Sequence, residues 1–92
     1  MELVTKQLRI EGLVQGVGFR YFMQRRARSL GVTGWVRNRT DGTVEAMVQG
    51  TADSIAAIIA QAKQGPRSAR VTSVKISDAQ GQFTAFDLLP TE

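Results

Sequence analysis

Residues 12–20, GLVQGVGFR, combine three glycines with an arginine, a composition typical of loops that bind anions. Gly16 and Gly18 can adopt positive φ angles at no steric cost, so successive backbone N–H groups can point inward as an anion-binding nest. If a helix follows, the unpaired amides of its first turn add a positive end. Arg20 adds a planar fork of donors that matches phosphate oxygens. The segment therefore predicts a phosphate cradle, and the alternative is a tight turn followed by a solvated arginine.

No histidine or cysteine occurs among the 92 residues, and this limits the chemistry that the chain can perform. It excludes an imidazole base, a thiolate nucleophile, a disulfide and metal ligation by either residue type. Catalysis would have to use carboxylates, Arg, Lys, Asn, Gln, hydroxyls or backbone amides. With 12 basic and 8 acidic residues the net charge is +4, which fits an anionic small substrate, a nucleic acid or simply a solvated basic surface.

Apolar residues alternate in several segments and recur at helical spacing in two others. Gly31 and Gly65 mark helix ends, and Asp41-Gly42 marks a hairpin. The expected elements are a strand at 4–14, a helix at 20–30, strands at 32–39 and 43–50, a helix between Thr51 and Gly65, a strand at 69–79 and a short strand within 83–89. This order predicts an α+β ferredoxin-like βαββαβ sandwich, with two helices on one face of an antiparallel sheet. We expect residues 1–92 to form one domain.

Asn38 is expected beside the glycine-rich loop because of the lengths of the elements between them. The first helix leads away from the loop for about 11 residues, or roughly 16 Å, and the second strand returns over about 5 residues, or roughly 16 Å. The carboxamide of Asn38 cannot act as a base at neutral pH, but it can hold and orient a water. Beside a bound phosphate, that water would attack phosphorus in line, and a good leaving group such as a carboxylate would be needed. The alternative is that Asn38 caps its own turn.

Two longer segments that contain these residues, IEGLVQGVGFR and GWVRNRTDGTVEAMVQG, resemble the two signature segments of the acylphosphatases. The likeness extends to GPRSARV after the second helix and to the order of elements, so it covers nearly the whole chain. The resemblance implies hydrolysis of acyl phosphates to a carboxylate and inorganic phosphate, without a metal or other cofactor. It implies that Arg20 binds the phosphate and that Asn38 orients the water. The loop amides of Gln15, Gly16, Val17, Gly18 and Phe19 would complete the cradle.

Other polar and aromatic residues are assigned to packing or to the surface. Trp35 is expected in the core or packed on a sheet face. Gln15 is expected to contribute its side chain to the shape of the loop rather than to catalysis. Five arginines are expected to be solvated, of which the last two should point away from Asn38: Arg25, Arg26, Arg28, Arg37 and Arg39.

Two other functions stay open on the sequence alone. A non-catalytic anion-binding or regulatory domain of the same fold would bind phosphate without turnover. An RNA-binding module shares this order of elements, but the first and third strands here carry none of the aromatic residues that stack bases in such domains. We expect a cytoplasmic monomer that acts on a small acyl phosphate, without a nucleic-acid partner, a signal peptide or a membrane span.

Overall fold

The structure is a computed structural model that describes residues 2–92. This part of the chain forms the following strands and helices: β1 (Val4–Leu13), α1 (Phe19–Leu30), β2 (Thr33–Asn38), β3 (Val44–Gly50), α2 (Ala52–Gln64), β4 (Arg70–Asp78) and β5 (Phe86–Leu88). The order is the predicted one, and the ends of the elements differ from the prediction by a few residues.

Short-range chemistry explains where several of these elements begin and end. Gly31 ends α1 in the left-handed conformation, with φ 71°. The Thr51 side chain caps α2 by accepting a hydrogen bond of 3.2 Å from the Ser54 backbone N–H. In the β2–β3 hairpin, the Asp41 carboxylate accepts hydrogen bonds from the backbone N–H of Thr43 at 3.0 Å and from its hydroxyl at 2.7 Å.

The sheet has the strand order β4-β1-β3-β2-β5. β1 pairs antiparallel with β3 and β4, and β2 pairs antiparallel with β3. β1 and β2 therefore run in the same direction on either side of β3, and their C-terminal ends lie at the same end of the sheet. The glycine-rich loop leaves β1 at this end of the sheet, so the end of β2 lies next to the loop, as predicted.

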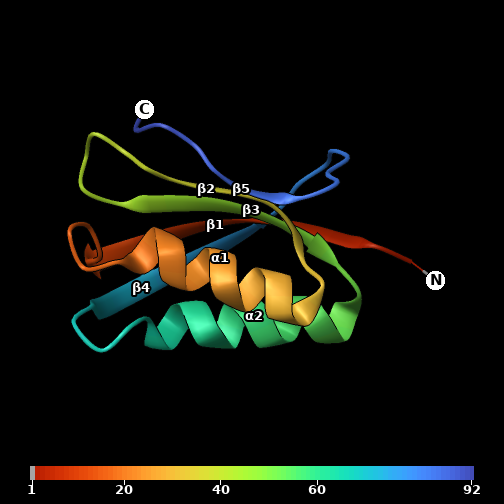
Figure 1. Ribbon diagram of the computed structural model, residues 1–92, viewed down its shortest axis with the longest axis horizontal. Helices are drawn as coiled ribbons and strands as arrows, with labels where there is room; N and C mark the ends of the chain where they lie inside the picture. Colours follow the sequence, from red (N-terminus) through yellow and green to blue (C-terminus); the bar gives the residue numbers. More distant parts are fainter. Residues whose placement is uncertain (1) are drawn as a thin grey trace.

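Four of the strands form the predicted antiparallel sheet, whereas β5 pairs in parallel with β2, so the sheet is mixed. Residues 79–85 carry the chain from β4 to the opposite edge, past the end at which β1 begins (Figure 1). There the Ala79 N–H donates to the Thr5 carbonyl at 3.2 Å, and the Gln49 side chain donates to the Gly81 carbonyl at 2.8 Å. Because β2 begins at that same end, a strand that starts there runs parallel to it.

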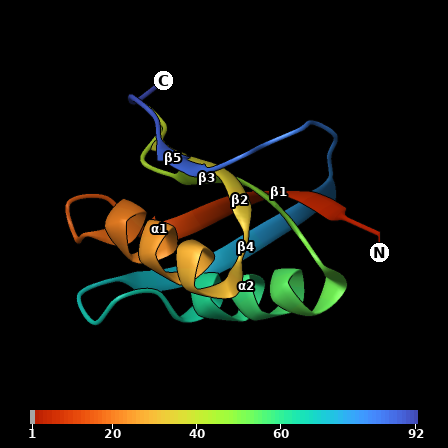
Figure 2. The same ribbon diagram turned by 45° about the vertical axis from the view of Figure 1, so that its right-hand side comes forward.

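Both helices cover one face of the sheet, and the core lies between them and the strands (Figure 1, Figure 2). α1 packs on β2 and β5, α2 packs on β1, β3 and β4, and the two helices contact each other. The largest fully buried side chains are Phe19, Phe86, Leu8, Ile10, Met23, Ile58, Val14, Val36, Val44 and Val48. Between residues 2 and 92, neither helix has the length and apolar character to cross a membrane.

The face of the sheet without helices, called the open face below, carries the alternate side chains of the strands. Trp35 is half-buried there, and the Arg37 guanidinium lies 4.8 Å from the centre of its ring. Arg37 and Arg39 point away from Asn38, as predicted. They are paired rather than solvated, because both contact the buried carboxylate of Glu45, at 2.9 Å and 3.4 Å, and the Arg37 side chain is only 18% exposed. The expectation of solvated arginines was therefore wrong for these two.

Candidate active site

Residues 14–18 join β1 to α1 and contain two glycines in the left-handed conformation. Gly16 has φ 73° and Gly18 has φ 79°, a region that other residues rarely adopt. A Cβ at either position would meet no atom within 4 Å, so glycine is needed here for backbone conformation and not for space. Gly18 caps α1 without a side-chain hydrogen bond, and the first turn holds no acidic residue. The first-turn amides of α1 therefore stay available to an anion.

Arg20 lies in the first turn of α1 and is half-buried. No carboxylate of residues 2–92 forms an ion pair with its guanidinium. A planar guanidinium that is free of protein carboxylates can bind two oxygens of a phosphate at once. Arg20 lies beside the glycines and adds a full positive charge to the partial charges of the backbone amides.

Asn38 is the last residue of β2, and its side chain lies on the same face as the buried Val36 because side chains alternate along a strand. The turn that follows is closed by Asp41 and by the hydrogen bond from the Arg39 N–H to the Thr43 carbonyl, at 2.8 Å. In the described chain no hydrogen bond joins the Asn38 carboxamide to this turn, so the alternative of a self-capping residue finds no support. The carboxamide is left free to hold a water or an oxygen of a ligand.

These residues meet in one small pocket of about 150 Å³. Its lining consists of Val14, Gly16, Gly18, Phe19, Arg20, Tyr21 and Asn38. The expected return of β2 to the level of the loop is confirmed, because Asn38 and Arg20 share this pocket although 18 positions of the chain separate them. No carboxylate belongs to the lining, so an anionic ligand would meet no acidic side chain in its wall.

Gln15 and Val17 were predicted in the cradle, and their side chains do not line the pocket. Val17 packs against the hydrophobic core. The Gln15 side-chain amide instead donates two hydrogen bonds, to the Arg39 carbonyl at 2.7 Å and to the Thr43 carbonyl at 2.9 Å. It thereby ties the loop to the turn that follows Asn38. The predicted role of the Gln15 and Val17 backbone amides in phosphate binding stays a prediction.

Tyr21 belongs to the pocket but was not singled out from the sequence. It follows Arg20 directly and falls off the buried stripe of α1 that contains Phe19, Phe22 and Met23. The side chain is 62% exposed. A large aromatic residue outside the apolar stripe, next to the arginine predicted to bind phosphate, was the signal that could have identified it.

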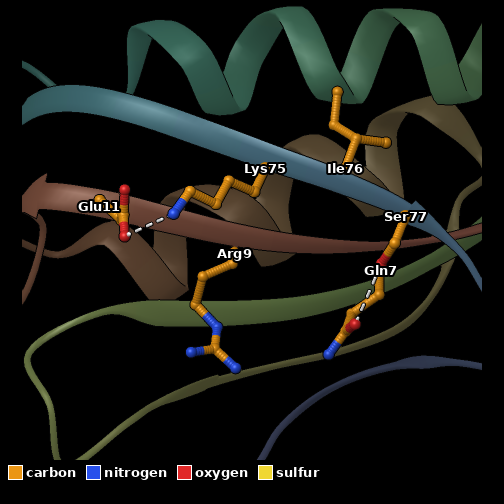
Figure 3. A pocket seen from close by; sticks show the side chains of 6 residues that line it. All are labelled: Gln7, Arg9, Glu11, Lys75, Ile76 and Ser77. Carbon is orange, nitrogen blue, oxygen red and sulfur yellow. Dashed lines mark hydrogen bonds and ion pairs between the residues drawn. The ribbon is translucent and has the colours of Figure 1, made fainter.

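A larger hollow of about 280 Å³ lies elsewhere, between β1 and β4, and Figure 3 shows the residues around it. Its charged groups have partners: Lys75 lies 3.5 Å from the Glu11 carboxylate, and Arg9 lies 3.5 Å from that of Asp41. The Ser77 hydroxyl donates to the Gln7 side chain at 3.2 Å. The backbone here belongs to β1 and to the edge strand β4, which pair with each other. This hollow lacks the glycine-rich loop, the helix N-terminus and the unpaired arginine of the smaller pocket, so the smaller pocket is the better anion site.

Comparison with known proteins identifies the family of this chain and agrees with its architecture. The sequence profile of the acylphosphatase family matches residues 6–88. The chain belongs to the acylphosphatase family. It is 54% identical to an acylphosphatase of Thiobacillus denitrificans over 83 residues. The aligned region covers 90% of this chain and 93% of that relative. The resemblance seen in the two signature segments is thus confirmed.

Solved structures of acylphosphatases have the same fold as this chain. The crystal structure of an acylphosphatase from Bacillus subtilis matches with a TM-score of 0.90 at 31% identity, over 96% of this chain and 99% of that one. The crystal structure of full-length HypF in its phosphate- and nucleotide-bound form matches with a TM-score of 0.90 at 26% identity. That match covers 98% of this chain but 12% of HypF, so the acylphosphatase fold also occurs as a small part of a larger protein.

Proposed function

We propose that this chain hydrolyses acyl phosphates to a carboxylate and inorganic phosphate, in the pocket formed by residues 14–21 and Asn38. One observation carries the proposal: an arginine without a carboxylate partner, two left-handed glycines at a helix N-terminus and a carboxamide line the same small pocket. Membership of the acylphosphatase family and 54% identity to a relative of that name support an acyl phosphate as the substrate.

The phosphoryl group is held by Arg20 and by the loop amides. The guanidinium takes two phosphate oxygens, and the backbone N–H groups from Gln15 to Phe19 and the first turn of α1 surround the third. This arrangement carries positive charge before the substrate arrives. Such donors stabilise the additional charge that develops on the phosphoryl oxygens during transfer.

Asn38 orients the attacking water from the end of β2. The water oxygen forms a bond to phosphorus while the bond from phosphorus to the bridging oxygen breaks, and that electron pair leaves with the carboxylate. The carboxylate is a stable anion and needs no proton as it departs. Both protons of the water end on inorganic phosphate, because among the described residues the pocket is lined by no carboxylate or other side chain that accepts a proton, and the Arg20 guanidinium is already protonated. The mechanism so written uses no metal or other cofactor.

The experiment that tests this proposal compares the wild-type chain with Asn38→Ala, on benzoyl phosphate in EDTA. Loss of the oriented water should lower kcat by about 100-fold or more, while inorganic phosphate still inhibits at a similar concentration. Activity that EDTA abolishes would contradict the metal-free mechanism. A wild-type chain that binds phosphate without turnover would instead favour the non-catalytic anion-binding domain, the alternative that the occurrence of this fold within HypF keeps relevant.

The chain is further proposed to act as a cytoplasmic monomer. Every residue that lines the pocket comes from residues 14–21 and 38 of one chain, so the site is complete without a second copy. The absence of cysteine from the sequence fits a reducing compartment. Sedimentation at the mass of one chain is the expected result, and a stable dimer would overturn this assignment.

A further inference from the structure

At about 150 Å³, the small pocket lies below the roughly 300–1,000 Å³ typical of pockets that enclose drug-sized ligands. A phosphoryl group seated in the loop therefore leaves little room in the pocket for a bulky acyl group. In an acyl phosphate the carbonyl carbon is one bond away from the bridging oxygen. When the phosphate is seated in the loop, a bulky acyl group therefore extends to the rim. What lies at the rim then decides which acyl groups bind well, an inference that rests on the function proposed above.

Tyr21 is the apolar side chain exposed at this rim. Val14 and Phe19 also line the pocket, but both are buried in the core. In residues 2–92 the large exposed hydrophobic side chains are Leu3, Leu13, Tyr21 and Ile76. Of these, Tyr21 is the one that lines the pocket. Tyr21 is therefore the exposed apolar surface that this lining offers to an acyl group extending beyond the phosphate site.

The fold itself makes little use of the Tyr21 ring. The aromatic pair of α1 is Phe19 with Phe22, and the cation–π contacts of the described chain involve the rings of Phe22 and Trp35. No hydrogen bond joins the Tyr21 hydroxyl to any described residue. An aromatic ring that is 62% exposed and without such a partner can gain contact area by covering a ligand.

We propose that Tyr21 forms an acyl subsite that favours acyl phosphates with an aromatic acyl group over those with a small aliphatic one. A flat aromatic acyl group can stack on the ring or meet its edge, and both arrangements remove apolar surface from water. An acetyl group offers one methyl and gains much less. The preference belongs to the ring rather than to the hydroxyl. Tyr21 thus adds selectivity for the acyl part to a pocket whose other residues address the phosphate.

The test compares benzoyl phosphate with acetyl phosphate as substrates of wild type, Tyr21→Ser, Tyr21→Phe and Leu3→Ser. Leu3 is a matched control because it is 63% exposed and precedes β1, at the end of that strand remote from the loop. The measured quantity is the ratio of kcat/KM for benzoyl phosphate to that for acetyl phosphate. Tyr21→Ser should lower this ratio by about 3- to 10-fold, while Tyr21→Phe and Leu3→Ser should keep it within about twofold of wild type.

Binding of stable analogues separates this subsite from the proposed turnover. Phenacylphosphonate and acetonylphosphonate replace the bridging oxygen by a methylene group, and calorimetry gives their Kd ratio without any reaction. The Tyr21→Ser change should shift that ratio by the same factor. An unchanged ratio in both assays, or a Tyr21→Phe ratio as low as that of Tyr21→Ser, would overturn the assignment to the ring. If wild type hydrolyses neither phosphate but the analogue ratio still depends on Tyr21, the proposed turnover fails while the subsite stands.

Discussion

Arg20 differs from the arginines of the open face in what surrounds its charge. Arg9 pairs with Asp41, and Arg37 and Arg39 both pair with Glu45. Those guanidinium groups are compensated by the protein and are poor candidates for a ligand anion. The net charge of +4 therefore does not mark the site by itself. The site is marked by an arginine that has no protein carboxylate and lies next to the free amides of a glycine-rich loop.

The geometry of Arg20 should matter as much as its charge. Arg20→Lys keeps one positive charge but replaces a planar fork by a single ammonium group, which cannot bind two phosphate oxygens in the same way. We expect kcat/KM for benzoyl phosphate to fall by about 100-fold or more and the inhibition constant of inorganic phosphate to rise. Arg25→Lys, on the exposed surface of the same helix, is the control and should change neither value. Near-full activity of Arg20→Lys would mean that the cradle does not depend on bidentate contact.

Gly16, Gly18 and Arg20 were predictable from local chemistry, and the place of Asn38 was predictable from the lengths of the elements that separate it from the loop. Gly16, Gly18 and Arg20 lie within five positions, and the conformation of the loop follows from the glycines themselves. Glu45 was not predictable in the same way, because its burial depends on the register that places it opposite Arg9 and Arg37.

The loop and the β2–β3 hairpin are joined by a single side chain. Both N–H groups of the Gln15 amide are used, on the carbonyls of Arg39 and Thr43, the two residues that close the turn after Asn38. The phosphate-binding loop and the strand end that carries Asn38 are therefore held together at the point where their relative position affects the reaction. A small shift between them would misalign water and phosphorus.

Replacing Gln15 by methionine should loosen this connection while keeping the length of the side chain. Two hydrogen bonds are lost, so the free energy of unfolding should fall by about 1–3 kcal/mol, although each carbonyl keeps a backbone donor, Gly42 on Arg39 and Arg39 on Thr43. We also expect kcat to fall by about 10-fold or more, with a smaller change in KM, because the water is misplaced rather than the phosphate released. Enzyme kinetics and urea unfolding of the same variant measure both effects.

Gln24→Met is the matched control for Gln15→Met. The Gln24 amide donates to the Phe86 carbonyl at 3.1 Å and so ties α1 to β5, and Gln24 does not line the pocket. This variant should lose stability but keep its kcat. If both variants lose activity in proportion to their loss of stability, Gln15 has only a structural role.

At the level of strands and helices, the sequence predicted what short-range signals determine. Each of these signals acts on residues a few positions away. The Asp41-Gly42 turn, the Thr51 cap and the helix end at Gly31 are all found where they were expected. The parallel pairing of β5 was beyond such signals. It depends on the route of residues 79–85 around the end of the sheet, which is set by contacts with Thr5 and Gln49, far away in the chain.

Across the whole molecule, the sheet connects the active-site pocket with the open face. Alternation along β2 places Asn38 in the pocket and the flanking Arg37 and Arg39 on Glu45. Glu45 also accepts a hydrogen bond from Gln7 of β1, so its carboxylate links three neighbouring strands. The same set of contacts that stabilises the centre of the sheet therefore fixes the strand that carries Asn38.

The ionised form of Glu45 should contribute to stability in a pH-dependent way. Burial raises the pKa of Glu45, but hydrogen bonds from Arg37 and Gln7 and the charges of Arg37 and Arg39 outweigh it, so the pKa lies below the ordinary value of 4.5. A carboxyl group whose pKa is lower in the folded state stabilises that state above its unfolded pKa. This contribution is lost as the pH falls through the folded pKa.

Urea unfolding of wild type and Glu45→Gln at a series of pH values from 7 to 3 measures this contribution. At pH 7 the variant should be less stable by about 1–3 kcal/mol, because buried donors lose a charged acceptor. The difference should shrink below about pH 4.5, where the wild-type carboxyl begins to be protonated in the unfolded state. Since both helices share one core with the sheet, each curve should show a single transition.

Glu11→Gln provides the comparison on the same face of the sheet. Glu11 pairs with Lys75 at 3.5 Å, and its side chain is 37% exposed against 7% for Glu45. An exposed pair of this kind is worth less than about 1 kcal/mol, so Glu11→Gln should change the unfolding curves little at any pH. A Glu45→Gln difference that stays constant from pH 7 to pH 3 would show that shape rather than charge is lost. The strand that carries Asn38 would then be held by packing, and its position would be insensitive to acid.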